Sequence, residues 1–283
     1  MPLVIRTKTK IFLAGLVQRG VMAARRLAGL GPVLICRRGG LQWRIDLAEG
    51  IDFSIFLLGA FEPTTVAAYR DLVAPGATVI DIGANIGAHT LPLADLAGAK
   101  GRVIAVEPTR YAFERMTDNL SLNPGLAARV TPVQAMLLAN PDREVAAALP
   151  SSWPLHGDRE AHPEHGGVCK STEGARALTL DDLVGSLGLE RVDFIKLDVD
   201  GYELEVLRGA RETLARFAPV ILFEHSPYVL VEKGFDPEEM IGILRTAGYG
   251  FYQLSGQPFG DGAAHLPDIA VGASINVLAK KRS

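Results

Sequence analysis

Two short apolar runs, each with an acidic side chain at or beside its end, most constrain the fold of this chain. The first run, 78–82, leads into a turn that contains Gly83 and Gly87, and the second run, 102–106, is followed directly by Glu107. Short unbroken apolar runs are typical of parallel strands that are buried on both faces. The pattern therefore predicts a strand–turn–helix–strand unit of the kind that holds a nucleoside.

The turn after the first run distinguishes between cofactors. Its glycines are spaced Gly-x-x-x-Gly, whereas dinucleotide-binding folds use Gly-x-Gly-x-x-Gly. Asp81, inside this motif, would repel a pyrophosphate and attract the cationic amino-acid end of S-adenosylmethionine. Glu107 ends the next strand, where a carboxylate can accept hydrogen bonds from both hydroxyl groups of a ribose. The residues therefore favour S-adenosylmethionine over NAD, and the alternative is a glycine turn in an unrelated α/β domain.

Length and composition limit the remaining possibilities. The 283 residues are 48% apolar, which suffices for one large core or for one domain with appendages. The net charge of −3 gives no general nucleic-acid-binding character. Cys36 and Cys169 are too few and too far apart for a disulfide framework or a thiolate metal site, so a cytoplasmic protein is expected. The apolar runs are too short to span a membrane.

The first 45 residues depart from this charge balance. Every charged residue before Asp46 is Lys or Arg, and the apolar residues in 11–27 recur at roughly helical spacing. The pattern predicts a basic amphipathic helix, which would rest on anionic lipid or pack on the domain or on a partner subunit. Gln18 and Arg19 interrupt the apolar stretch, which argues against a cleaved signal. Peripheral membrane contact through the basic N-terminus is therefore an open expectation.

Strand-like and helix-like segments alternate from residue 78 onward. Strands are expected at 78–82, 102–107, 129–134, 192–198, 219–224, 249–253 and 274–279. Helices are expected at 62–74, 86–97, 110–122, 180–187, 203–215 and 237–247. Such alternation predicts a mainly parallel sheet covered by helices on both faces. The Gly/Pro-rich stretch before the last strand indicates that the last two strands form an antiparallel pair.

The chain divides into two parts on this interpretation. Residues 1–60 form an appendage of the basic helix and a small β region over 31–61, and residues 61–283 form the main domain. A polar insertion rich in Pro and Gly occupies 140–176.

The insertion raises the question of a metal site. It contains three histidines and a nearby cysteine, which are His156, His162, His165 and Cys169. Their spacing matches no common zinc pattern, so we expect a substrate-facing lid or an added hairpin.

Four segments carry a resemblance to a known family. They are 79–90, 107–123, 178–183 and 193–210, the last containing Ile-Lys-Leu-Asp-Val-Asp-Gly-Tyr-Glu. Together they resemble the FkbM family of S-adenosylmethionine-dependent methyltransferases over about residues 60–280. The sequence differs from the family pattern at Asp200, where the family usually has Glu, and at 135–139, which is unusually apolar. The resemblance implies a class I, Rossmann-like methyltransferase fold with a doubly wound seven-stranded sheet. It also implies methyl transfer, generally to oxygen, often on sugars, glycolipids or polyketide-type natural products.

The cofactor contacts are expected at the ends of the first three strands. The residues are Asp81, Gly83, Asn85 and Gly87 at the methionine end, Glu107 at the ribose, and Pro108 and Gln134 near the adenine.

Catalytic residues are expected at the ends of the next two strands. Asp198 and Asp200 follow one strand, and Glu224 and His225 end its neighbour, so their side chains would share one cleft. Asp198, Asp200 or His225 would take a proton from a hydroxyl. Alternatively Asp198, Glu224 and His225 would bind Mg²⁺ or Mn²⁺, which resembles the ligand placement in catechol-type O-methyltransferases. In a third interpretation these are structural polar groups, with Lys196 pairing a carboxylate.

The sequence thus predicts an S-adenosylmethionine-dependent O-methyltransferase that acts on a hydroxyl of a sugar, glycolipid or natural product. An NAD-linked oxidoreductase is one alternative, which the missing Gly-x-Gly-x-x-Gly argues against. A non-catalytic scaffold is another, which the intact Asp81, Gly83, Glu107 and Asp198 argue against. A small-molecule or glycan acceptor is expected and a nucleic acid is not, because the basic residues lie away from the motifs.

Overall fold

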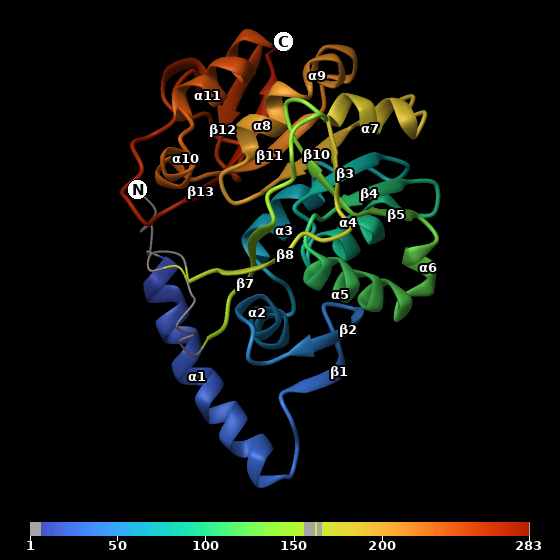
Figure 1. The fold of residues 1–283 in the computed structure, drawn as a ribbon, viewed down its shortest axis with the longest axis vertical. Helices are drawn as coiled ribbons and strands as arrows, with labels where there is room; N and C mark the ends of the chain where they lie inside the picture. The colour runs from blue at the N-terminus through green and yellow to red at the C-terminus, as the bar shows by residue number, and fades with distance from the viewer. Residues whose placement is uncertain (1–6, 156–161, 163–165, 283) are drawn as a thin grey trace.

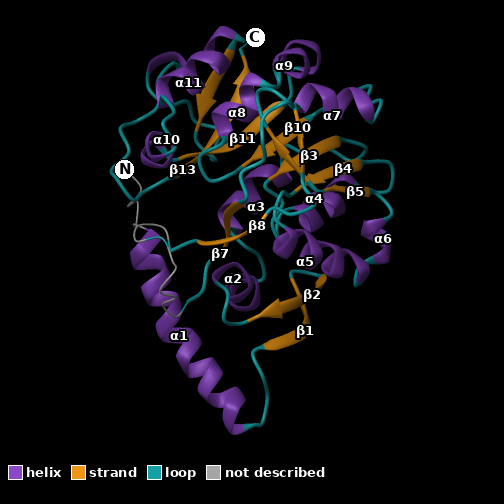
Figure 2. Cartoon of the chain, viewed as in Figure 1, coloured by secondary structure: helices purple, strands orange, loops and turns teal. Residues whose placement is uncertain are grey.

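The computed structural model describes residues 7–155, 162 and 166–282 (Figure 1). A large sheet with helices around it forms the upper part of the molecule in Figure 1, and an N-terminal appendage forms the lower end. Figure 2 shows the strands of the large sheet side by side, between helices.

The large sheet has seven strands. They are β3 (Thr78–Ile82), β4 (Arg102–Val106), β5 (Val130–Val133), β10 (Phe194–Leu197), β11 (Val220–His225), β12 (Tyr249–Tyr252) and β13 (Ile275–Lys281). Their order across the sheet is β12-β13-β11-β10-β3-β4-β5. β13 is antiparallel to both of its neighbours, and the other pairs are parallel. The expected doubly wound, mainly parallel sheet with an antiparallel last pair is therefore confirmed.

Helices cover both faces of this sheet. They are α3 (Pro63–Arg70), α4 (Thr90–Ala97), α5 (Arg110–Ser121), α6 (Pro124–Ala127), α7 (Leu180–Ser186), α8 (Glu203–Arg208), α9 (Arg211–Phe217), α10 (Pro227–Glu232) and α11 (Pro237–Thr246), with a short 3-10 helix at Asp261–Ala263. One core contains apolar side chains of α7, α8, α9 and α11, and the core on the opposite face contains those of α3 and α4. Alternate residues of each strand enter opposite cores, as the period of a strand requires.

The helix expected over 203–215 is divided in two at Gly209. A Cβ at this position would overlap the carbonyl oxygen of Leu138, so only glycine fits there. The carboxylate of Asp181 then accepts hydrogen bonds from the backbone N–H groups of Glu212 (3.0 Å) and Thr213 (2.8 Å), which caps the new helix α9. The break between α8 and α9 therefore results from the close contact of Gly209 with Leu138 and from the cap that Asp181 provides.

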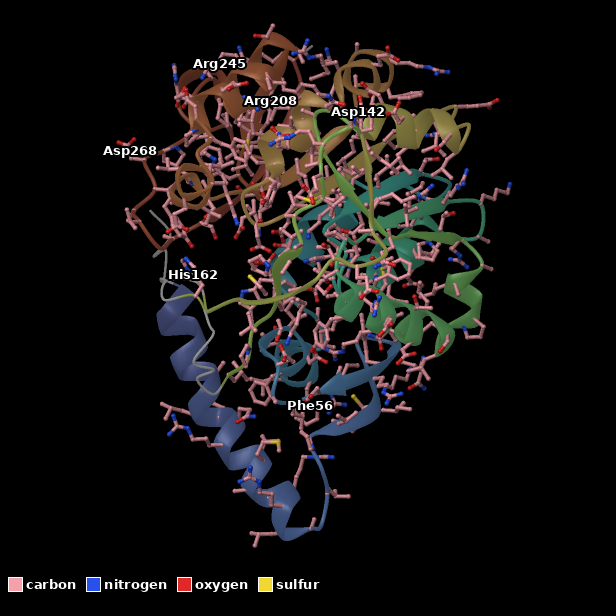
Figure 3. All side chains as sticks on the ribbon, viewed as in Figure 1. Phe56, Asp142, His162, Arg208, Arg245 and Asp268 are labelled. Carbon is pink, nitrogen blue, oxygen red and sulfur yellow. The ribbon has the colours of Figure 1, made fainter. Side chains whose placement is uncertain are left out.

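Arg208 ties the end of α8 to the neighbouring helix α11. Its guanidinium, labelled in Figure 3, donates to both carboxylate oxygens of Glu239 at 2.8 and 2.7 Å, and to Glu205 at 2.8 Å. The two-pronged geometry fixes the orientation of α8 as well as its distance. α8 follows directly on the loop that contains Asp198 and Asp200, so this contact helps to position that loop.

The appendage begins with α1 (Thr7–Leu27) and a hairpin of β1 (Val33–Arg38) and β2 (Leu41–Asp46). Gly39 and Gly40 form the two-residue turn with φ of 57° and 85°, as a type I′ turn requires. The inner face of the hairpin, which includes Trp43 and Ile45, packs on Ile86 and other residues of the sheet domain in one core.

The expected β region over 31–61 is wrong in its second half. Gly50–Leu58 is a helix, α2, that ends at Gly59 with φ of 84°, and the N–H of Gly59 donates to the carbonyl of Ile55 at 2.9 Å. This segment is apolar on nearly all sides, and a short apolar run does not distinguish a buried strand from a buried helix. Phe53 and Ile55 point into the core shared with the sheet domain.

The insertion at 140–176 contains a hairpin, one of the two forms that the sequence led us to expect. β7 (Ala148–Ser152) and β8 (Val168–Ser171) pair antiparallel, and β6 (Ala135–Leu137) pairs in parallel with β9 (Arg176–Leu178). β7 continues into the appendage, where the N–H of Gly50 donates to the carbonyl of Trp153 at 2.8 Å. His156 and His165 lie outside the described residues.

Within the described ranges, no single helix is long and apolar enough to cross a membrane. The bent pair α2 and α3, which meet at 68°, together reach the required length and apolar composition.

We predict that Gly209→Ala destabilises the protein by about 1–3 kcal/mol, because the added methyl group displaces the backbone at Leu138. Gly185→Ala is the matched control, since Gly185 lies in α7 with open space around it and gains about 0.5–1 kcal/mol of helix stability. Urea unfolding monitored by circular dichroism measures both. Equal stability of the two variants would contradict the close contact at Gly209.

Candidate active site

A cavity of about 850 Å³ lies at the carboxyl ends of β3, β4, β10 and β11. In open α/β sheets, ligands bind at this edge, where the strand order reverses direction between β3 and β10. Residues of α2 and of the β7 segment, such as Phe53 and Leu149, complete the wall on the side of the appendage. The sheet domain, the N-terminal appendage and the insertion therefore all contribute to the wall of the cavity.

Gly83 provides the closest approach between the turn after β3 and the end of β10. Its φ is 81°, and a Cβ on Gly83 would overlap the carbonyl oxygen of Asp198. The N–H of Gly83 donates to the carbonyl of Val106 at 3.0 Å, which holds the turn against β4. Glycine is therefore required both for the backbone angle and for the contact. Gly83 lines the cavity.

Glu107 presents a fixed carboxylate at the end of β4. One oxygen accepts from the N–H of Asn85 at 2.9 Å, and the other accepts from the N–H and Oγ1 of Thr109 at 2.9 and 2.6 Å. The residue is only 4% exposed, and burial raises the pKa of its carboxyl despite these hydrogen bonds. A carboxylate has about four acceptor positions, so one remains for a ligand. This arrangement fits a ribose hydroxyl at the cavity wall.

Three residues of the cavity wall have strained backbones. Glu62, Asn85 and Asp200 have φ of 44°, 47° and 49°, which side chains other than glycine rarely adopt. The Oδ1 of Asn85 accepts from the N–H of Ile86 at 2.8 Å, which supports the turn locally. Such strain costs about 1–3 kcal/mol per residue and is typical of functional sites.

The cofactor residues expected from the sequence separate into two groups. Gly83, Asn85, Glu107 and Pro108 line the cavity, whereas Asp81, Gly87 and Gln134 do not.

Each of the three outlying residues has a different environment. Asp81 is fully buried on the face of the sheet covered by α3 and α4, where its Oδ2 accepts from Thr90 Oγ1 at 2.6 Å. Burial raises the pKa of the Asp81 carboxyl, and the nearby Lys196 opposes that rise. Gly87 packs against Met116, and the side-chain amide of Gln134 donates to the carbonyl of Glu173 at 2.9 Å.

Lys196 is the buried cation of the site. It is 3% exposed, and its Nζ lies 3.0 Å from Oδ2 of Asp198. Burial lowers the pKa of Lys196, but the carboxylates of Asp198 and Asp81 outweigh that effect and the net pKa is raised. The ammonium group is therefore charged and engaged with carboxylates at neutral pH.

The loop after β10 presents a carboxyl group to the cavity. Burial raises the pKa of Asp200 well above its usual range, and the negative charge of Asp198 adds to the rise. The side chain of Glu203 accepts from the N–H groups of Val199 (3.0 Å) and Gly201 (3.3 Å), which fixes this loop. Burial raises the pKa of Glu203 to about 7. Asp198 and Asp200 thus line the cavity as the sequence predicted.

His225 does not reach the cavity, contrary to the sequence-based expectation of a base or a metal ligand. Leu222 and Phe223 enter cores on opposite faces of the sheet, so Glu224 shares the face of Leu222 and His225 shares the face of Phe223. The ring of His225 lies against that of Phe223, and burial lowers its pKa to about 4.

The predicted metal ligands are therefore not brought together. Glu224 lines the cavity and accepts from Ser274 Oγ at 2.5 Å, but the adjacent His225 points the other way. Over the ranges that the structure describes, no three His, Cys, Asp or Glu side chains gather in a way that could hold a metal ion. Adjacent positions on a strand face opposite sides of the sheet, so Glu224 and His225 cannot bind one metal ion together with Asp198.

Glu62 is a site residue that sequence reasoning missed. Its carboxylate accepts from Thr65 Oγ1 and from Asn276 Nδ2, each at 3.0 Å, and it lines the cavity. Burial raises the pKa of Glu62, and the negative charge of Asp198 raises it further. The sequence showed only that Glu62 precedes a helix start at Pro63. Its polarity next to an apolar segment was the one available indication.

The sheet order, the antiparallel β13 and the cavity at the strand ends together define the class I methyltransferase fold. Residues 81–251, more than half of the chain, match the Methyltransferase FkbM domain, and the chain belongs to this methyltransferase family. The donor that this family uses is S-adenosylmethionine, and the residues at Gly83 and Glu107 fit it.

Two relatives and one solved structure show how far the likeness extends. The chain is 30% identical over 167 residues to hexuronic acid methyltransferase AglP of Haloferax volcanii, covering 59% of this chain and 61% of AglP. It is 29% identical over 196 residues to methyltransferase sdnD of Sordaria araneosa, covering 56% of this chain and 73% of sdnD. The FkbM methyltransferase from Methylobacillus flagellatus KT is 17% identical with a TM-score of 0.43, covering 76% of this chain and 50% of that one. The chain thus spans less than two thirds of AglP.

We predict that Glu107→Gln weakens binding of S-adenosylhomocysteine about 10- to 100-fold, because a carboxylate hydrogen bond to the ribose becomes a neutral one. Glu114→Gln, on the exposed side of α5, is the matched control and should bind as the wild type does. Isothermal titration calorimetry measures both affinities. Unchanged binding by Glu107→Gln would contradict the assignment of Glu107 to the ribose.

Proposed function

We propose that this protein transfers the methyl group of S-adenosylmethionine to a hydroxyl group of a sugar, glycolipid or natural product. The observation that carries the proposal is the order of groups along the sheet edge. Glu107 and Gly83 end β4 and β3, whereas Asp198 and Glu224 end β10 and β11. Neighbouring strands are about 4.8 Å apart, so this row spans on the order of 14 Å, enough for a nucleoside and an acceptor side by side.

S-adenosylmethionine supplies a methyl group on a sulfonium, which is already a strong electrophile. The protein then has two tasks, which are to hold the acceptor oxygen in line and to remove its proton. Glu107 holds the ribose of the donor, Gly83 and Asn85 lie at its methionine end, and the loop after β10 faces the acceptor.

We assign the proton removal to Asp200. Burial raises the pKa of its carboxyl well above the usual range, which makes the carboxylate a stronger base than an exposed aspartate. Asp198 is held by Lys196 at 3.0 Å, and its negative charge contributes to the raised pKa of Asp200. The carboxylate of Asp200 would accept the hydroxyl proton while the oxygen attacks the methyl carbon. The S–CH3 bond would break, and S-adenosylhomocysteine would leave as a neutral thioether.

The acceptor end of the cavity favours neutral hydroxylated molecules. Its wall includes the hydroxyl groups of Ser226 and Tyr228. It also includes the hydroxyl of Ser274 and the side-chain amide of Asn276, which already donate to Glu224 and Glu62. Among the described residues that line the cavity, Lys196 is the one Lys or Arg, and it is already engaged with Asp198. A uronic acid carboxylate would therefore meet buried acids without a free cation. We infer that the acceptor differs in this respect from the hexuronic acid named for AglP.

We predict that Asp200→Asn lowers kcat by about 100-fold or more while the affinity for S-adenosylhomocysteine stays within a factor of two, because the loss of a general base affects the chemical step. The wild-type rate should fall as the pH falls through the raised pKa of Asp200, since the protonated carboxyl cannot accept a proton. The variant should lose this acid limb in a pH–rate profile.

Asp142→Asn is the control for this substitution, because Asp142 is exposed, lies outside the cavity lining and is labelled in Figure 3. A rate for Asp200→Asn equal to that of this control would rule out Asp200 as the base.

We predict that neutral glycosides accept the methyl group at least tenfold faster than the matching hexuronic acids, because the described residues around the acceptor end hold no Lys or Arg other than the engaged Lys196. A panel of paired acceptors with ¹³C-labelled donor measures the rates, and ¹³C NMR of the product distinguishes an O-methyl from an N-methyl or C-methyl group. Preference for the hexuronic acids, or a methyl group on nitrogen or carbon, would contradict the proposed acceptor class.

A further inference from the structure

The appendage exposes a concentration of large apolar side chains. Eight of the ten such exposed residues in the described part of the chain lie between positions 16 and 58, and they are Leu16, Val17, Leu27, Leu30, Val33, Ile35, Leu57 and Leu58. The other two, Val231 and Val271, lie in the sheet domain. Scattered apolar residues are normal on a protein surface, but this concentration in one small part of the fold indicates an interaction surface.

Helix α1 has one face on the protein and one face outward. Gly15, Gln18 and Met22 face inward, and the side-chain amide of Gln18 donates to the carbonyl of Leu47 at 2.9 Å. Leu16 and Leu27 belong to the opposite, exposed face, and Leu27 is 91% exposed. In Figure 1, α1 runs along the outside of the appendage. Its outward face is therefore open to a partner.

Positive charge accompanies the apolar residues. The first 45 residues contain nine Lys and Arg and no Asp or Glu. Arg19 and Arg26 flank a cavity of about 430 Å³ with apolar walls that include Met22 and Leu30. Over residues 7–155, 162 and 166–282, no carboxylate lies within ion-pair distance of Arg19, Arg26 or Arg37. These guanidinium groups are available to an external anion.

The outer face of the hairpin repeats the same chemistry. Val33, Ile35 and Arg37 alternate along β1 toward solvent, while the residues between them point inward. Opposite Ile35 on β2 lies Arg44, which is also exposed. Apolar and cationic side chains thus intermix on the hairpin as they do on α1.

We propose that this basic apolar surface, made of Leu16, Val17, Arg19, Arg26, Leu27, Leu30, Val33 and Ile35, binds a membrane that carries anionic lipid. The apolar side chains enter the boundary between headgroups and acyl chains, and Arg19 and Arg26 contact lipid phosphates. The positive charge of this surface favours an anionic membrane as its binding partner. A second copy of the same surface would bring two sets of cations together without a carboxylate to offset them.

The surface also approaches the active-site cavity. Leu57 and Leu58, exposed at the end of α2, line that cavity together with Ala14 of α1. If the proposed transfer to a glycolipid holds, an acceptor anchored in the membrane would enter past these side chains. This consequence rests on the proposed function, whereas the binding of the protein to lipid does not.

Sedimentation with vesicles tests the proposal without reference to methyl transfer. The vesicles contain 30% phosphatidylglycerol in phosphatidylcholine, with pure phosphatidylcholine for comparison. The wild type should sediment with the anionic vesicles and lose binding as salt is raised. The triple variant Leu27→Glu/Leu30→Glu/Ile35→Glu should lose at least tenfold in partition coefficient. Arg19→Gln/Arg26→Gln should lose roughly thirtyfold, at about 1 kcal/mol for each arginine.

The control is Val231→Glu/Val271→Glu, which changes equally exposed valines outside the surface and should bind as the wild type does. The thermal shift given by S-adenosylhomocysteine confirms that each variant is folded. Wild-type binding by both test variants would overturn the proposal, as would an equal loss in the control. A dimer of the wild type that the triple variant abolishes, without vesicle binding, would assign the surface to a second copy instead.

Discussion

The buried ammonium group of Lys196 is the interaction on which the rest of the site depends. It lies on the face of the sheet covered by α3 and α4, next to Asp81 on β3 and within 3.0 Å of Asp198 beyond the end of β10. Glu62 and Glu224 approach the same region from α3 and β11. Removing the cation would leave several carboxylates in a buried space, which costs several kcal/mol. One charge thus holds together neighbouring strands, the start of α3 and the loop after β10.

Much of the fold could be predicted from the sequence because its strands are short, mainly apolar runs that alternate with helix-like segments. All seven expected strands occur within a few residues of the expected bounds. The second half of the appendage could not be assigned, since the apolar segment at 50–58 fits a buried helix as well as a strand. The break at Gly209 depends on Leu138, which is about 70 positions away in the chain.

The site was predictable to a lesser degree. Glu107 and Asp198 were found because an acid directly after an apolar strand reaches the sheet edge whichever way the strand twists. His225 does not line the cavity, because one residue along a strand reverses the direction of a side chain. Asp81 shares the face of Lys196 but is fully buried against Thr90 instead of lining the cavity. Glu62 was missed because its role comes from Thr65 and Asn276, the second of which lies more than 200 positions away. Long-range partners of this kind leave no local pattern.

The contact between Gly83 and the carbonyl group of Asp198 joins the proposed donor side of the cavity to the proposed acceptor side. The two segments touch through backbone atoms, without a side chain between them that could yield. A shift of the loop after β10 is therefore passed directly to the turn after β3. A ligand that displaced the loop after β10 would therefore also displace the turn at Gly83, through main-chain atoms alone.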